Sequence, residues 1–122
     1  MKLMKIEATK YSPGVELNSE GEMIIHGRSI QEDPIAFYKP IIEWIKNCPS
    51  KTFTLEIRLE YMNTSSTKVL LDFIKSVKEK YNSSEVFIKW YYESDDDDML
   101  ELGKDFESII CIPIDFYELC EN

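Results

Sequence analysis

One strictly alternating segment, KTFTLEIRLEYMN at residues 51–63, most narrows what this chain can fold into. Its apolar side chains all face one way: Phe53, Leu55, Ile57, Leu59 and Tyr61. The side chains between them are polar or charged: Thr54, Glu56, Arg58 and Glu60. Alternation with a period of two and one charged face indicates a strand in a sheet that is covered on one side only.

A helical pattern follows this strand at once, from about Ser65 to Tyr81. Its apolar residues recur at helical spacing and can lie on the covered face of the sheet: Val69, Leu70, Phe73, Ile74 and Val77. A second helix is expected after Asp33, which would be its N-cap, with Pro34 as its first residue. Pro40 lies inside this helix and predicts a kink or a second start.

The remaining elements complete an alternating order of strands and helices. They are a strand at 3–8, a hairpin at 15–27 with its turn at 18–21, a strand at 85–92, a short helix within 94–106 and a last strand at 109–114. The last strand is expected near an edge, because Pro113 cannot donate to a ladder. This order predicts an α/β fold: a two-layer sandwich with a mixed sheet, helices mainly on one face and an N-terminal hairpin. At 122 residues the chain is expected to form one domain, 1–122.

Charge and cysteine content bound the possible partners. A net charge of −9 is interpreted here as uniform acidity, which disfavours nucleic acid and anionic membranes and favours a basic protein surface. The three cysteines are far apart, which argues against a disulfide framework and a zinc site: Cys48, Cys111 and Cys120. No apolar run reaches membrane-spanning length and no signal peptide is visible, so the cytoplasm is the default location.

The junction between the strand and the helix carries an unusual run, Asn-Thr-Ser-Ser-Thr at residues 63–67. A helix N-cap needs only one such residue, and either Asn63 or Thr64 would serve. The other interpretation is that the turn presents a hydroxyl for modification. A phosphate on Thr64 would lie where free helix N–H groups and the positive end of the helix dipole favour negative charge.

Other chemical signals in the sequence are weaker. Ser65 and Lys68 match the S-x-x-K nucleophile motif, but no S-D-N or K-T-G accompanies them. The acidic run Asp95–Asp98 lacks the glycine of a calcium-binding loop and is interpreted as a solvated helix start. His26 is the only histidine and has no nucleophile context around it. No cofactor or metal is therefore expected. In the strand at 85–92, Phe87 and Tyr91 are expected on the face opposite Trp90.

Taken together, these motifs resemble the SiaC family of bacterial regulatory phosphoproteins. The resemblance rests on Asn-Thr-Ser-Ser at 63–66, on the tryptophan-containing helix ending in IIEWI, on the strand VFIKWYYE and on an N-terminal segment with Thr9, Ser12, Pro13 and Val15. It implies a fold like that of STAS domains, the anti-sigma-factor antagonists, and a non-enzymatic role in a partner switch.

The resemblance also implies a mechanism. A kinase of the histidine-kinase-like ATPase type would phosphorylate Thr64, and a PP2C-type phosphatase would remove the phosphate. The unphosphorylated form would bind and regulate an effector, for which a diguanylate cyclase is the candidate, and would thereby act in cyclic-di-GMP signalling. The partner-binding turn would include Tyr61, Asn63, Ser65, Ser66 and Lys68. Two alternatives stay open: a constitutive scaffold that uses the exposed strand face, and a small hydrolase that uses Ser65 with Lys68.

Overall fold

The computed structural model describes residues 3–119, which form a six-stranded mixed sheet with three helices packed on it. The strands follow the chain in the spatial order β1-β2-β3-β4-β5-β6. Their bounds are β1 Leu3–Ile6, β2 Gly14–Asn18, β3 Glu22–Ser29, β4 Phe53–Met62, β5 Val86–Glu93 and β6 Ile114–Leu119. The first three strands pair antiparallel, and β3 to β6 pair parallel. The predicted mixed sheet with an N-terminal hairpin is confirmed.

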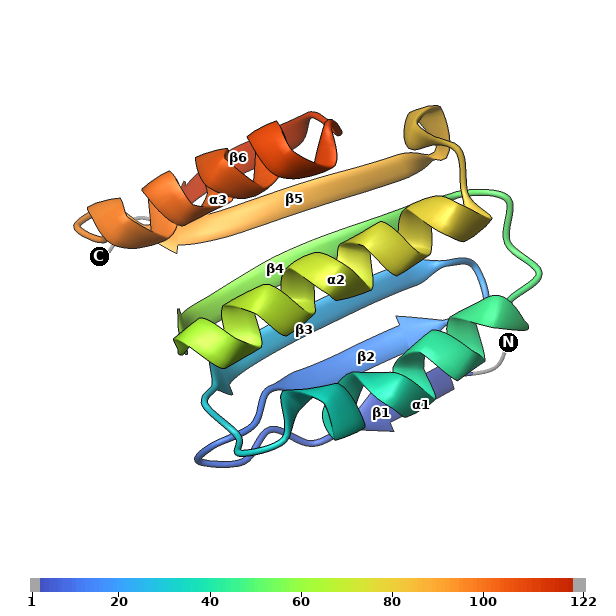
Figure 1. The fold of residues 1–122 in the computed structure, drawn as a ribbon, viewed down its shortest axis with the longest axis horizontal. Coiled ribbons are helices and arrows are strands. Elements are labelled where there is room, and N and C mark those ends of the chain that lie inside the picture. The colour runs from blue at the N-terminus through green and yellow to red at the C-terminus, as the bar shows by residue number, and fades with distance from the viewer. Residues whose placement is uncertain (1–2, 120–122) are drawn as a thin grey trace.

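Each helix joins two neighbouring parallel strands. α1 spans Pro34–Lys46, α2 spans Thr64–Lys80 and α3 spans Asp97–Ile110, and a short 3₁₀ helix at Ser83–Glu85 precedes β5. Figure 1 shows all three helices on the same face of the sheet. Because right-handed crossovers between successive strands always return on the same side, this monotonic strand order places every helix in one layer. The two-layer arrangement is therefore as predicted, and no helix of residues 3–119 covers the opposite face of the sheet, which we call the uncovered face.

The helix starts follow from their caps. The Asp33 side chain accepts a hydrogen bond from the Ala36 N–H at 3.0 Å, and Pro34 opens α1 where no intrahelical N–H is needed. α1 then continues through Pro40 to Lys46, so the expected second start does not occur. Pro40 is exposed, which spares the core from its ring. Tyr38, Ile41 and Ile45 form the buried side of this helix.

The C-terminal assignment from sequence is wrong at residues 109–114. These residues end α3, pass through Cys111 in the left-handed region (φ 57°), and reach the strand only at Ile114. The run IICIPI looks like a strand because β-branched residues favour sheets, but Phe106 and Ile110 lie one turn apart on the buried side of α3. The strand is IDFYEL, and as predicted for the last strand it lies at the edge of the sheet.

A candidate interaction site at the strand-to-helix turn

The turn between β4 and α2 is capped by Asn63 alone. Its side-chain oxygen accepts the Ser66 N–H at 2.9 Å, and its backbone oxygen accepts the Thr67 N–H at 2.9 Å. The Thr67 hydroxyl donates to the same backbone oxygen, and the Ser65 hydroxyl donates to the Asn63 side chain at 3.3 Å. Of the two predicted cap residues, Asn63 is the one used, so Thr64 is not needed for capping.

Thr64 is the first residue of α2, and its side chain is exposed. Among residues 3–119 its hydroxyl makes no side-chain hydrogen bond, in contrast to its neighbours Ser65 and Thr67. The free backbone N–H groups of the first helical turn lie beside it, at the positive end of the α2 dipole. Thr64 therefore combines an accessible hydroxyl with surroundings that favour negative charge.

Ser66 belongs to this turn but not to its surface. It is fully buried, and its hydroxyl has no hydrogen-bond partner within the described part of the chain. The prediction that Ser66 contributes to a partner-binding surface is therefore wrong for its side chain, because it occupies an inward position one turn before Leu70. Its role in the turn comes from its backbone N–H, which Asn63 receives.

Tyr61 faces solvent, contrary to the alternation expected from the sequence. The pairing of β3 with β4 shifts between Gly27 and Arg28, so that Leu59 pairs with Gly27 and Tyr61 with Arg28. Glu60 is the extra residue, and such a bulge reverses the side-chain alternation beyond it. Tyr61 is consequently 52% exposed, while Met62 takes the buried position next to the turn. The bulge thus places an aromatic ring on the surface three residues before Thr64.

The loop between β1 and β2 lies against the same end of the molecule. The Ile30 N–H donates to the Tyr11 carbonyl at 2.8 Å, and the Asn63 N–H donates to the Ser29 carbonyl at 3.1 Å. Figure 1 shows this loop, the ends of β3 and β4 and the starts of α1 and α2 gathered at one end. The structure therefore brings together the two segments that carried the family resemblance, one with Thr9 and Ser12 and the other with Thr64.

The loop is held in shape by its own hydroxyl groups. The Thr9 hydroxyl accepts the N–H groups of Tyr11 and Ser12, and it lies 2.7 Å from the Ser12 hydroxyl. This arrangement presents the Tyr11 ring, which is 58% exposed. Ile35 in the first turn of α1 is also exposed, so Tyr11, Ile35 and Tyr61 give the end that carries Thr64 three large apolar side chains on its surface. We call these three residues the apolar trio.

Polar side chains also lie in the interior at this end of the molecule. The Ser29 hydroxyl donates to Gln31 at 2.9 Å, and the Tyr38 hydroxyl is buried with no hydrogen-bond partner among residues 3–119. Burial raises the pKa of the Tyr38 hydroxyl well above its ordinary value, and the nearby Ser29 hydroxyl opposes this only in part. Tyr38 therefore stays neutral and packs against Phe73, with 5.2 Å between the ring centroids.

The sequence motifs for other chemistry are not assembled. Ser65 donates to Asn63, and no hydrogen bond joins it to Lys68 among residues 3–119. His26 is exposed on the uncovered sheet face. Within the same described range, no three His, Cys, Asp or Glu side chains are grouped as a metal site requires. The run Asp95–Asp98 spans the start of α3: Asp96 is the N-cap and accepts the Met99 N–H at 3.0 Å, as expected for a solvated helix start.

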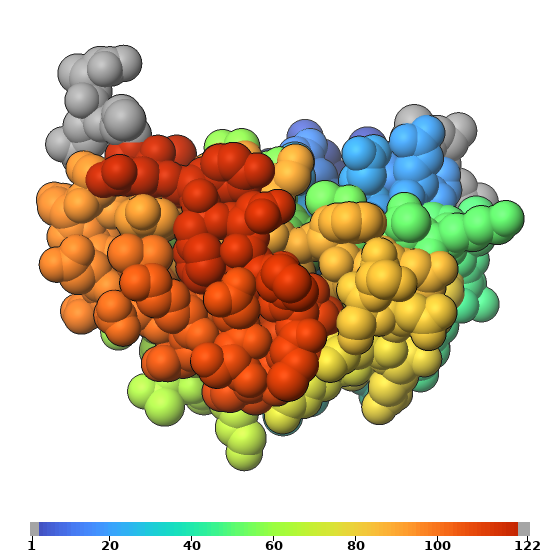
Figure 2. All heavy atoms as spheres, turned by 90° about the horizontal axis from the view of Figure 1, so that it is seen from above, coloured from blue at the N-terminus to red at the C-terminus, as the bar shows by residue number. Residues whose placement is uncertain are grey.

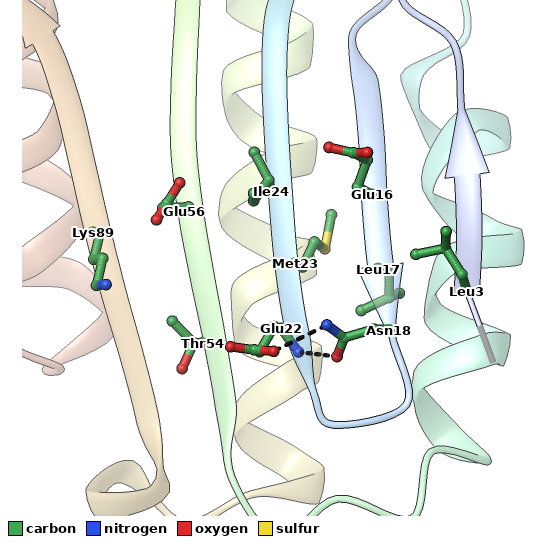
Figure 3. Close-up of a pocket in the computed structure, with 10 residues that line it drawn as sticks. All are labelled: Leu3, Glu16, Leu17, Asn18, Glu22, Met23, Ile24, Thr54, Glu56 and Lys89. Atoms are coloured by element: carbon green, nitrogen blue, oxygen red, sulfur yellow. Dashed lines mark hydrogen bonds between the residues drawn. The ribbon is translucent and has the colours of Figure 1, made fainter. Parts of the chain in front are cut away.

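A shallow depression of about 320 Å³ lies elsewhere, on the uncovered sheet face (Figure 3). Its polar lining includes Glu16, Glu22, Glu56 and Lys89, and Ile24 contributes to its floor. Glu22 pairs with Thr54 at the beginning of β4, whereas Thr64 follows the end of that strand. The depression is therefore separate from the turn.

Solved structures establish the class of fold. The chain aligns with SiaC of Pseudomonas aeruginosa with a TM-score of 0.83 and 22% identity, covering 98% of this chain and 100% of that one. It aligns with a structure of the diguanylate cyclase SiaD in complex with its activator SiaC, from the same organism, with a TM-score of 0.84 and 22% identity. That alignment covers 95% of this chain and 99% of the matched chain. The fold is thus that of the SiaC structures.

Sequence comparison gives the family itself. The family model for SiaC family regulatory phosphoproteins matches residues 6–119. An uncharacterised protein of Pseudomonas aeruginosa strain UCBPP-PA14 is 24% identical over 115 residues, which are 90% of this chain and 91% of that protein. The chain therefore belongs to the SiaC family and is a regulatory protein, not an enzyme. The hydrolase alternative with Ser65 and Lys68 is set aside on this basis. No helix within residues 3–119 has the length and apolarity to cross a bilayer.

Proposed function

We propose that this protein is a phosphorylation-controlled partner switch, with Thr64 as the phosphoacceptor. One observation carries the proposal: Thr64 is an exposed hydroxyl at the first position of α2, and Asn63 already caps that helix. Membership of a family of regulatory phosphoproteins supports the same function. Ser66 is excluded as an acceptor by its burial, and the hydroxyls of Ser65 and Thr67 are already engaged with Asn63.

A phosphate on Thr64 is compatible with the fold. Ser66 and Thr67 already direct their N–H groups to Asn63, whereas the N–H groups of Thr64 and Ser65 precede the intrahelical ladder. The first turn of α2 contains no acidic side chain that would repel the new charge. The phosphate adds nearly two negative charges at the positive end of the helix dipole, so the helix is preserved while its surface changes.

The effector is proposed to contact the apolar trio and Lys68, with Thr64 at the edge of this contact. Tyr11, Ile35 and Tyr61 provide exposed apolar area at the same end of the molecule as Thr64. Desolvating a phosphate at the edge of such a contact is costly, so phosphorylation would release the effector. The solved complex in which SiaC is the activator of the diguanylate cyclase SiaD makes a diguanylate cyclase the first effector to test.

The remaining partners follow from the same proposal. A dedicated kinase of the histidine-kinase-like ATPase type phosphorylates Thr64, and a PP2C-type phosphatase restores the binding form. Asn63 and Ser65 complete the turn that both enzymes must recognise. The switch itself needs no cofactor and acts in the cytoplasm.

The test is a comparison of two variants in phosphorylation and binding. Thr64→Ala is expected to abolish labelling by the candidate kinase and ATP, and to bind the candidate cyclase about as well as the unphosphorylated protein. Thr67→Ala makes the same change at a threonine whose hydroxyl already donates to the Asn63 backbone oxygen; it is the matched control and is expected to be labelled normally. Labelling that persists in Thr64→Ala would contradict the assignment. Effector binding that is indifferent to phosphorylation would favour the constitutive scaffold instead.

A further inference from the structure

The net charge of the chain is concentrated at one side, contrary to the uniform acidity inferred from composition. Residues 1–94 contain thirteen basic and thirteen acidic side chains, whereas residues 95–122 contain one basic and ten acidic ones. The entire excess of −9 therefore lies in the last quarter of the sequence. Within the described residues α3 and β6 hold most of it: Asp97, Asp98, Glu101, Asp105, Glu107, Asp115 and Glu118. Figure 2 looks onto these two elements, coloured orange and red.

β6 also offers a free backbone edge. It is the last strand of the sheet and pairs only with β5. The Ile114 N–H donates to the Glu107 side chain at 2.7 Å, so this residue directs its backbone away from β5. Because backbone direction alternates along a strand, Phe116 and Glu118 also point their N–H and C=O groups outward. Among residues 3–119 no strand lies beyond them.

An aromatic stack on the uncovered sheet face leads to this edge. The Arg58 guanidinium lies 3.9 Å from the centroid of the Tyr91 ring, and Tyr91 stacks on Tyr117 with centroids 5.0 Å apart. Tyr117 is the outermost ring and is 41% exposed. Asp115 precedes it by two residues and therefore lies on the same face of β6. An arginine that arrives at the edge can stack on Tyr117 and pair with Asp115.

We propose that the β6 edge is a docking surface for an extended basic segment of a partner protein, which adds a strand to the sheet. The backbone groups of Phe116 and Glu118 would supply the main-chain pairing, and the acidic side chains would select the partner's charge. A second copy of this chain is disfavoured, because β6 carries Asp115 and Glu118 and no basic residue, and two such edges repel. This surface lies outside the turn that carries Thr64, so its occupation does not require the phosphorylation switch.

The probe is a fluorescent peptide of about eight residues that alternates arginine and valine, a length that matches one ordinary strand. Its affinity for the full chain is measured by anisotropy at 0.15 M salt, where charges more than about 8 Å apart are largely screened. The edge variant is Asp115→Lys with Glu118→Lys. The matched control is Asp72→Lys with Glu79→Lys, which makes the same change in charge at two exposed positions of α2.

Binding is expected to weaken about tenfold or more in the edge variant and by no more than about threefold in the control, since only the edge pairs lie within contact distance of the peptide. In the unmodified protein, hydrogen exchange at the Phe116 and Glu118 amides is expected to slow when the peptide is added. If peptide affinity weakened equally in both variants, binding would depend on net charge alone and not on the β6 edge, and the proposal would be overturned. Protection at other amides, or dimerisation of the protein through β6, would also overturn it.

Discussion

The starts of α2 and α3 are built alike but charged differently. Each helix follows a parallel strand and is capped by a side-chain oxygen, of Asn63 at 2.9 Å in α2 and of Asp96 at 3.0 Å in α3. The first turn of α3 contains Asp97 and Asp98, whereas that of α2 contains no acidic residue. Since the N-terminus of a helix favours negative charge, α3 carries its stabilising charge permanently, and α2 presents a hydroxyl at which charge can be added.

The surface charge at the start of α3 is therefore constant, whereas the charge at the start of α2 can be changed by modification of Thr64. α3 is held against the sheet by the indole N–H of Trp90, which donates to the Met99 carbonyl at 3.1 Å, and by edge-to-face contact between Trp90 and Phe106. α2 is equally well packed through Leu70, Phe73 and Ile74, but its first residue is left outside the core. A modification at Thr64 therefore alters the surface without disturbing the packing beneath it.

The largest expected effect concerns the close fit of α3. A Cβ at Gly103 would lie 2.7 Å from the Phe116 ring and 2.9 Å from Trp90, so Gly103→Ala forces these rings apart. Overpacking of this kind costs about 1–3 kcal/mol, which the better helix propensity of alanine offsets by at most about 1 kcal/mol. Urea unfolding should show a net loss of stability. Ser108→Ala, at an exposed position of the same helix, is the control and should change little.

The two caps are expected to contribute equally. Asn63→Ala and Asp96→Ala each remove the side chain that receives an N–H of the first turn, and each should lower the free energy of unfolding by about 1 kcal/mol. Thermal unfolding of the two variants measures this. A negligible loss of stability in Asn63→Ala would mean that Thr64 takes over as cap. This would contradict the assignment of capping to Asn63 and of a free hydroxyl to Thr64.

Removing the buried hydroxyl of Ser66 is expected to raise the free energy of unfolding, whereas removing a cap lowers it. It is fully buried without a partner among residues 3–119, so Ser66→Ala removes an unsatisfied polar group. We expect a gain in stability of up to about 1 kcal/mol. Phosphorylation by the kinase should be unaffected. A loss of more than about 1 kcal/mol would instead show that Ser66 has a hydrogen-bond partner that the protein cannot replace.

The smallest effects test the charge difference itself. Thr64→Asp should stabilise the protein, and Asp97→Asn should destabilise it, each by about 0.3–1 kcal/mol through the helix dipole. Both effects should shrink at high salt, because exposed charges are screened. Unfolding in low and high sodium chloride compares them directly. If Thr64→Asp were destabilising, the start of α2 would not be suited to a phosphate.

Local sequence pattern was sufficient for most of the scaffold. Alternation in residues 53–59, helical spacing in α2 and the Asp33–Pro34 start all depend on neighbours along the chain, and all were confirmed. The expected exposure of Phe87 and Tyr91 opposite Trp90 follows from the same rule, and Trp90 is fully buried while Phe87 is 50% exposed.

The errors are of two kinds: one is decided by residues distant in sequence, and the others follow from local helical spacing. Tyr61 turns outward because of the register shift opposite Gly27, which no pattern within β4 reveals. Ile110 continues the buried side of α3 one turn beyond Phe106, although the composition of the segment resembles that of a strand. Ser66 could have been placed inside, since it precedes Leu70 and Phe73 by four and seven residues on the same helical face.

Phosphorylation at Thr64 is tested most directly by peptide mass spectrometry on the protein isolated from its native cells, before and after treatment with a PP2C-type phosphatase. A switch at Thr64 predicts a single phosphate, localised to this residue and removed by the phosphatase, with Ser65, Ser66 and Thr67 unmodified. A phosphate on another residue of the turn, or protein that stays unmodified even with its candidate kinase and ATP, would contradict the switch at the start of α2.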